Sequence, residues 1–118
     1  MATVPRRGSG QQAERRAVRH YRLRGYRVLG VNVWSAGYEL DLIVRRGRRL
    51  VFCEVKSKSG TRFGSAVEMV DREKQRRLLR AAEAWLVRNP SLRELRISFD
   101  VVAVDEGVLR RRPLGDPL

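Results

Sequence analysis

The sequence predicts a mixed α/β domain in which helices flank a central mixed sheet. Its apolar patterns follow the order helix, three strands, helix, strand. Two neighbouring strands flank a short glycine-containing turn, which is typical of an antiparallel hairpin, and the second helix provides a crossover between strands. A chain of 118 residues has the size of one domain. We therefore expect one domain over residues 10–112, preceded by a flexible basic arm (residues 1–9) and followed by a tail (residues 113–118).

The first half of the chain is expected to form one helix and three strands. Between residues 10 and 24, apolar side chains recur every three or four positions with arginines between them, as in an amphipathic helix. Runs rich in aliphatic and aromatic residues predict strands over residues 26–34, 39–45 and 50–56. The last two strands carry apolar residues on both faces, so we expect the sheet to be covered on both sides.

The second half is expected to form a helix and two further strands. Asp71 is a suitable N-cap for the helix, which ends before Asn89-Pro90. Strands are predicted over residues 95–104 and 108–112, and no internal repeat points to a second domain.

The charge of the chain favours a polyanionic partner. Lys and Arg number 26 and Asp and Glu number 13, which gives a formal net charge of +13. Such a positive field attracts nucleic acid. Most of the basic residues are arginine, so codon bias is an alternative origin of the charge. A basic protein bound to anionic membrane or ribosomal surfaces is a weaker alternative, because neither helix has a concentrated apolar face with aromatic anchors.

Cysteine usage and hydropathy indicate a cytoplasmic protein. Cys53 is the single cysteine, so neither an intramolecular disulfide nor a cysteine zinc cluster can form. No apolar run approaches the roughly 20 residues that a membrane-spanning helix needs. We therefore expect no membrane association.

Two carboxylates and one ammonium are predicted to converge on the hairpin. Glu54 and Lys56 are two residues apart on one strand, so their side chains share a face. If Arg45 pairs with Leu50 across the turn, Asp41 lies opposite Glu54. The same register places Glu39 opposite Lys56.

The chemistry of this group points to a hard divalent cation and to phosphodiester hydrolysis. Neighbouring carboxylates repel each other unless a cation, a proton or a basic side chain compensates them. Mg²⁺ binds one or two carboxylates together with waters. Bound metal activates a water and offsets charge in the transition state, while Lys56 can orient that water. The alternative is that Glu39, Glu54 and Lys56 only form cross-strand ion pairs.

Further residues are expected near this group. Glu14 shares the helix face that packs on the sheet, and Gln75 lies at the start of the second helix on its apolar stripe. Either residue can have an ordinary role instead, Glu14 as the partner of an arginine and Gln75 as a first-turn residue. The basic residues that we expect to contact phosphates are Lys58, Arg62, Lys74, Arg76 and Arg77.

A longer ordered set of residues carries a family resemblance that runs from about residue 10 to residue 104. The segments that match in order are residues 25–29 with Asn32, 39–43, 51–57, 62–64, 74–78 and 99–102, together with Glu14 and Ala17. On these segments the chain resembles uncharacterised protein family 0102, the YraN-like bacterial proteins, which are regarded as predicted endonucleases. One departure is Tyr38, which stands where the family usually has a glycine before the Glu-x-Asp motif.

The resemblance has implications for fold and activity. The family is similar in fold to the PD-(D/E)XK nucleases, particularly archaeal Holliday-junction resolvases, which implies a restriction-endonuclease-like αβββαβ core. It also implies a homodimeric, Mg²⁺- or Mn²⁺-dependent endonuclease that acts on DNA, with branched or recombination intermediates as substrates. The alternative is a non-catalytic nucleic-acid-binding module that keeps the nuclease fold.

The resemblance also assigns roles to individual residues. It implies Glu14, Asp41 and Glu54 as metal-site carboxylates and Val55 as a carbonyl ligand. It implies Lys56 as the catalytic lysine and Gln75 as an auxiliary active-site residue.

Overall fold

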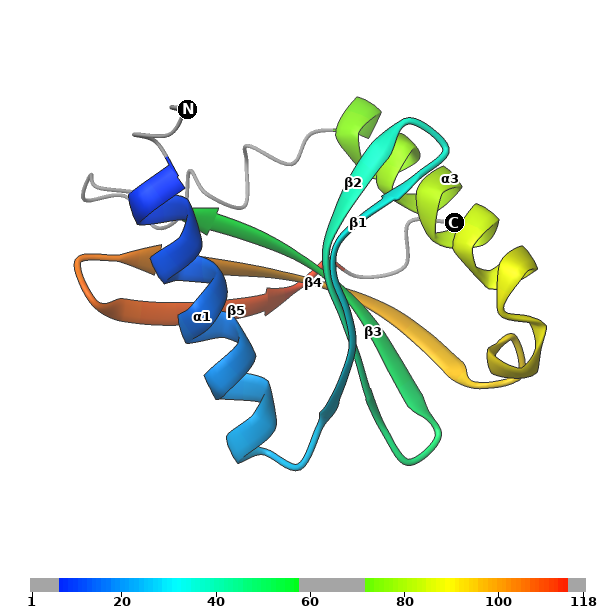
Figure 1. Cartoon of the computed structure of the whole chain (residues 1–118), viewed down its shortest axis with the longest axis horizontal. Coiled ribbons are helices and arrows are strands. Elements are labelled where there is room, and N and C mark those ends of the chain that lie inside the picture. Colours follow the sequence, from blue (N-terminus) through cyan, green and yellow to red (C-terminus); the bar gives the residue numbers. More distant parts are fainter. Residues whose placement is uncertain (1–6, 58–71, 115–118) are drawn as a thin grey trace.

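A five-stranded mixed sheet separates two helices in the computed structural model of the protein (Figure 1). The structure describes residues 7–57 and 72–114. Strand order follows the chain, and β3 and β4 are parallel while all other neighbouring pairs are antiparallel. The strands are β1 (Arg27–Ser35), β2 (Tyr38–Arg46), β3 (Arg49–Ser57), β4 (Arg96–Asp105) and β5 (Val108–Pro113).

The two helices cover opposite faces of the sheet (Figure 1). They are α1 (Arg7–Leu23) and α3 (Arg72–Arg88), and a 3₁₀ turn, η1 (Pro90–Leu92), follows α3. Alternate residues of β3 point to the two helices. Phe52 packs with Trp85 of α3, whereas Cys53 packs with Tyr21 of α1. The expectation that the sheet is covered on both sides is therefore confirmed.

The predicted mixed α/β class is confirmed, and the strand boundaries agree with the sequence pattern to within one residue. Helix and strand residues lie slightly beyond residues 10–112 at both ends. α1 begins at Arg7, three residues before the predicted start of the first helix. Pro113 pairs with Asp100, and Leu114 packs against the core on the α3 side. The division into arm, domain and tail stays a prediction. Residues 1–6, Asp71 and residues 115–118 lie outside the described residues.

The hairpin of β2 and β3 has the predicted register over part of its length. Arg45 pairs with Leu50, and the ladder continues to Leu42 and Cys53. There the paired ladder ends, one position before Asp41 and Glu54. No helix in the described part of the chain is long and apolar enough to cross a membrane.

Candidate active site

The end of the β2–β3 ladder brings a carboxylate onto the backbone of the next strand. Oδ2 of Asp41 accepts a hydrogen bond from the backbone N–H of Val55 at 2.9 Å. The Asp41 side chain thus takes the place of a strand partner, since the paired ladder stops at Leu42 and Cys53. This bond fixes Asp41 beside the Glu54–Val55 peptide.

The Glu54 carboxylate is buried and held at both of its oxygens. Oε1 accepts a hydrogen bond from the hydroxyl of Tyr38 at 3.0 Å. Oε2 lies 3.1 Å from Nζ of Lys56, and both side chains of this ion pair are largely shielded from solvent. Glu54 and Lys56 therefore share a face of β3, as the alternation along a strand predicts.

Glu39 does not face Lys56 as predicted. The structure places Glu39 in the β1–β2 ladder opposite Trp34, with its side chain exposed. The reason is that the ladder between β2 and β3 ends at Leu42, three residues after Glu39. Lys56 consequently pairs with Glu54, its neighbour on the same strand.

Asp41 carries a perturbed carboxyl group. Burial, followed by the negative charge of Glu54, raises the pKa of Asp41 to about 7, and the Glu14 charge acts in the same direction. The hydrogen bond from Val55 and the charge of Lys56 oppose this rise. With both Asp41 and Glu54 ionised, the site has more negative charge than Lys56 balances. A bound metal ion or a proton would reduce this repulsion.

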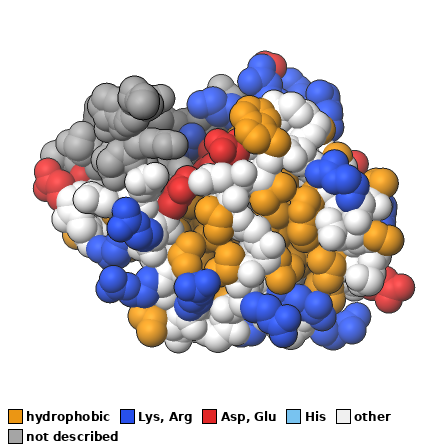
Figure 2. Space-filling view, viewed as in Figure 1, with side chains coloured by type: hydrophobic (Ala, Val, Ile, Leu, Met, Phe, Trp, Pro, Cys, Tyr) orange, Lys and Arg blue, Asp and Glu red, His pale blue; other side chains and the backbone are white. Residues whose placement is uncertain are grey.

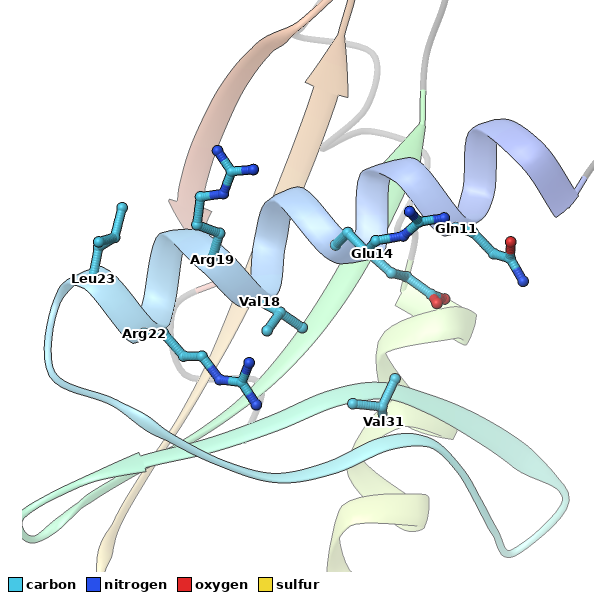
Figure 3. A pocket seen from close by; sticks show the side chains of 8 residues that line it. Gln11, Glu14, Val18, Arg19, Arg22, Leu23 and Val31 are labelled. Atoms are coloured by element: carbon cyan, nitrogen blue, oxygen red, sulfur yellow. The ribbon is translucent and has the colours of Figure 1, made fainter.

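Glu14 approaches the site from α1. Its Oε1 accepts a hydrogen bond at 3.1 Å from Nδ2 of Asn32, whose backbone has a φ of 54°. Figure 3 shows the Glu14 side chain on the flank of α1 nearest β1. Its charge raises the pKa of Asp41, but no hydrogen bond joins the two carboxylates in the described structure.

The first turns of α3 carry several of the residues predicted to lie near the site or to contact phosphates. The positive charge of Arg77 lowers the pKa of Tyr38, although burial and Glu54 raise it more strongly, so this part of α3 lies close to the Tyr38–Glu54 pair. Arg77 is exposed and also forms an ion pair with Glu73 at 3.1 Å. In the same helix Gln75 and Lys74 are half-buried and Arg76 is exposed. Lys58 and Arg62 lie outside the described residues.

The carboxylates fit a divalent cation only in part. The described residues contain no group of three or more His, Cys, Asp or Glu side chains that could hold a metal ion, so Glu14, Asp41 and Glu54 do not form one ligand cluster. Two carboxylates suffice for Mg²⁺ when waters complete its shell. Oδ1 of Asp41 accepts no hydrogen bond from any described residue and can serve as a ligand. The carbonyl of Val55 as a further ligand stays a prediction.

Tyr38 is a site residue that the sequence patterns did not single out as functional. The family resemblance leads one to expect a glycine at this position, and the departure to tyrosine was the available signal. Its hydroxyl reaches Glu54 because Tyr38 begins β2 beside β3.

One face of the molecule combines both signs of charge (Figure 2). Figure 2 shows Asp and Glu side chains gathered on the upper part of one face, next to the residues that are not described. Hydrophobic side chains extend below them, and Lys and Arg side chains surround this face. Acidic side chains within a largely basic surface can bind a cation, while the surrounding basic side chains attract a polyanion.

Comparison with known proteins decides the family. Residues 13–104 match the profile of Uncharacterised protein family UPF0102. The chain belongs to this family. A UPF0102 protein of Magnetococcus marinus is 44% identical over 95 residues, which cover 80% of this chain and 77% of the relative. A UPF0102 protein of Frankia alni is 42% identical over 115 residues, which cover 98% and 91%.

A third relative supports the same assignment. A UPF0102 protein of Acinetobacter baumannii is 38% identical over 96 residues, which cover 81% of this chain and 72% of the relative. The predicted family resemblance is therefore confirmed. The UPF0102 match spans all five candidate catalytic positions: Glu14, Asp41, Glu54, Lys56 and Gln75.

Proposed function

We propose that this UPF0102 protein is a metal-dependent endonuclease that hydrolyses phosphodiester bonds in DNA. The observation that carries the proposal is the grouping of Asp41, Glu54 and Lys56 where the β2–β3 ladder ends. The element order α1-β1-β2-β3-α3-β4 also corresponds to the αβββαβ order of a restriction-endonuclease-like core. Fold alone does not specify activity, so the side-chain chemistry is the main support.

Asp41 and Glu54 are the side chains that would hold the proposed cation, with the Val55 carbonyl as a third ligand. Mg²⁺ or Mn²⁺ would supply a Lewis acid that offsets negative charge on the phosphate in the transition state. The raised pKa of Asp41 supports this assignment, because a nearby cation would favour its charged form. Glu14 would add negative charge without contacting Asp41 directly.

Lys56 and Tyr38 have separate proposed roles. The ammonium of Lys56, held 3.1 Å from Glu54, would orient the attacking water and stabilise charge on the phosphate. The Tyr38 hydroxyl would act as a positioning group, because it fixes the other oxygen of Glu54. Gln75 is proposed as an auxiliary residue from the start of α3.

The substrate is proposed to be DNA held through its phosphates. Basic residues near the start of α3 would contact the backbone without reading the sequence. These residues are Lys74, Arg76 and Arg77, together with Lys58 and Arg62. Branched or recombination intermediates are the proposed substrate class, and a homodimer is the proposed assembly. The free, buried Cys53 suits a reducing compartment, so we place the activity in the cytoplasm.

A second candidate function is a non-catalytic nucleic-acid-binding module. One specific observation favours it: both oxygens of Glu54 already have partners, Tyr38 and Lys56. An internally compensated carboxylate has less need of a metal ion. On this alternative the basic surface binds DNA, and the Glu54–Lys56 pair only stabilises β3.

Cleavage assays separate the two functions. Labelled junction, flap and duplex DNA are incubated with the protein in the presence and absence of Mn²⁺. The Asp41→Asn variant removes a proposed ligand, and Glu94→Gln is a matched control at an exposed position in the turn after α3. Mn²⁺-dependent cleavage that Asp41→Asn abolishes and Glu94→Gln retains supports the nuclease. Salt-sensitive binding of all three substrates without cleavage supports the binding module.

A further inference from the structure

We propose that the groove between α1 and β1 binds single-stranded nucleic acid and guides it to the candidate active site. The groove has a volume of about 660 Å³ and is open to solvent. Figure 3 shows α1 as one wall, with Val31 of β1 opposite. This volume lies within the range of pockets for drug-sized ligands, so it accommodates one or two nucleotides but not a duplex.

The groove presents apolar side chains that no described element covers. Val31 is 43% exposed and Leu23 is 75% exposed, whereas Val18 is half-buried and also packs against the core. β1 pairs only with β2, so its outer edge has no partner among the described strands. Proteins that bind single strands commonly stack the bases on aromatic side chains. Here the aliphatic side chains of the groove would contact the base faces instead, which likewise does not depend on sequence.

The groove also carries a line of positive charge. Arg15 and Arg22 lie seven residues apart on α1, on either side of Val18, which separates their Cα atoms by two helical turns, about 10.5 Å. Both side chains line the groove and are exposed. Neither forms an ion pair within the described residues. Their guanidinium groups are thus available to successive phosphates of one strand.

One residue that lines the groove, Glu14, lies near enough to the candidate active site for its charge to raise the pKa of Asp41. Glu14 is also tied to β1 through Asn32 at 3.1 Å. Glu14 places a negative charge beside Arg15, so phosphate is attracted less strongly there than at the Arg22 end unless a cation is bound. A strand would therefore be held most firmly at the Arg22 end, and a bound metal ion would favour its approach to Asp41 and Glu54. This last step rests on the proposed function, but the binding itself does not.

The test measures binding without metal. Fluorescein-labelled single-stranded oligothymidine is titrated with the full chain in EDTA, and fluorescence anisotropy is followed at several salt concentrations. The groove variant is Arg15→Ala with Arg22→Ala. The matched control is Arg48→Ala with Arg93→Ala, which removes the same charge from two exposed turns away from the groove.

The groove variant is expected to bind about tenfold more weakly at moderate salt. Its slope of log K against log salt should be less negative by about 1.4, because each lost single-strand phosphate contact contributes about 0.7. The control should behave like the wild type. A third variant, Val31→Glu, places a carboxylate on the apolar floor and should weaken oligothymidine binding while leaving duplex binding unchanged.

Equal affinity and equal salt slopes for the groove variant and the control would overturn the inference. It would also be overturned if Val31→Glu converted a dimer to a monomer in light scattering without changing oligothymidine binding, since a second copy of the chain would then fill the groove. Failure of the proposed nuclease function would give a different set of results. If the wild type never cleaves but the groove variant loses binding, the groove inference stands and the nuclease proposal does not.

Discussion

The hydroxyl of Tyr38 on β2 donates a hydrogen bond to Oε1 of Glu54 on β3 at 3.0 Å, while Lys56 lies 3.1 Å from Oε2. Two donors, one on each oxygen, fix the plane of this carboxylate. Burial, followed by the negative charge of Glu54, raises the pKa of Tyr38 far above its ordinary value, so the hydroxyl remains a donor at neutral pH. The orientation of Glu54 therefore depends on a residue of the neighbouring strand.

The Tyr38→Phe variant should lower the proposed cleavage activity without abolishing it. Loss of one donor lets Glu54 rotate, and misplacement of a catalytic group by about 1 Å costs up to roughly 100-fold in rate. We expect kcat to fall between roughly 10- and 100-fold with little change in KM, as measured by steady-state cleavage in Mn²⁺. Tyr26→Phe is the matched control, because the Tyr26 hydroxyl has no hydrogen-bond partner among the described residues. A kcat equal to that of the control would refute the positioning role.

The Asp41 carboxyl should make stability fall as the pH rises. Its pKa is about 7 in the folded protein against an ordinary value of 3.8, so between these pH values the folded state binds more protons than the unfolded chain. The free energy of unfolding therefore has its full Asp41 contribution below about pH 4 and loses about 2 to 4 kcal/mol as the pH rises from about 4 to about 7. Urea unfolding in EDTA across this range measures the effect.

The Asp41→Asn variant is the direct check on that pH dependence. Asparagine keeps an oxygen that can accept the Val55 hydrogen bond but carries no charge. We expect the variant to be more stable than the wild type at pH 8 and nearly equal to it at pH 4. Glu39→Gln, an exposed change on the same strand, should retain the wild-type profile. A wild-type protein whose stability increases between pH 5 and 8 relative to Asp41→Asn would contradict the assignment.

Mn²⁺ should stabilise the protein through Asp41 and Glu54. A ligand that binds only the folded state at 100 times its Kd adds about 2.7 kcal/mol to the free energy of unfolding. We expect the Tm to rise by several degrees in Mn²⁺ at pH 8, and to rise less at pH 5 because protons compete for Asp41. Thermal scans of the wild type and Asp41→Asn test this. The same rise in both proteins would mean that Mn²⁺ binds elsewhere.

A buried carboxylate on the α1 side of the sheet should matter for stability. Oδ2 of Asp100 accepts hydrogen bonds from the Tyr21 hydroxyl at 2.7 Å and from Arg111 at 3.2 Å. Arg111→Met removes one of these donors and should cost about 1 to 2 kcal/mol, because Arg111 is partly exposed and the ion pair is screened. Urea unfolding measures this loss. Arg112→Met, a change at an exposed neighbour on β5, should cost less, and equal losses would show that Asp100 does not depend on Arg111.

The positions of the strands and the pairing of the hairpin followed from local patterns. The β2–β3 turn contains Gly47, and the apolar runs on either side of it have matching lengths, so Arg45 and Leu50 could be paired from the sequence. Strand alternation likewise put Glu54 and Lys56 on one face. Such predictions succeed because they depend on periodicities of two or about four residues.

Relationships between distant residues were not predictable in the same way. The end of the β2–β3 ladder left Glu39 facing solvent instead of Lys56, and no pattern within either strand indicates where two strands stop pairing. The Asn32–Glu14 bond depends on a positive φ at Asn32 and on how α1 packs beside β1.

By itself, the sequence determined the mixed α/β class, the strand register near the turn, the family and the identity of the acidic and basic side chains. Only the tertiary structure decided that Asp41 bonds to the Val55 backbone, that Tyr38 holds Glu54 and that Glu14 stays outside a shared ligand cluster. The physical reason is that the sequence pattern fixes which face a side chain occupies. The contacts that the side chain makes depend on twist, packing and burial across elements that lie far apart in the chain.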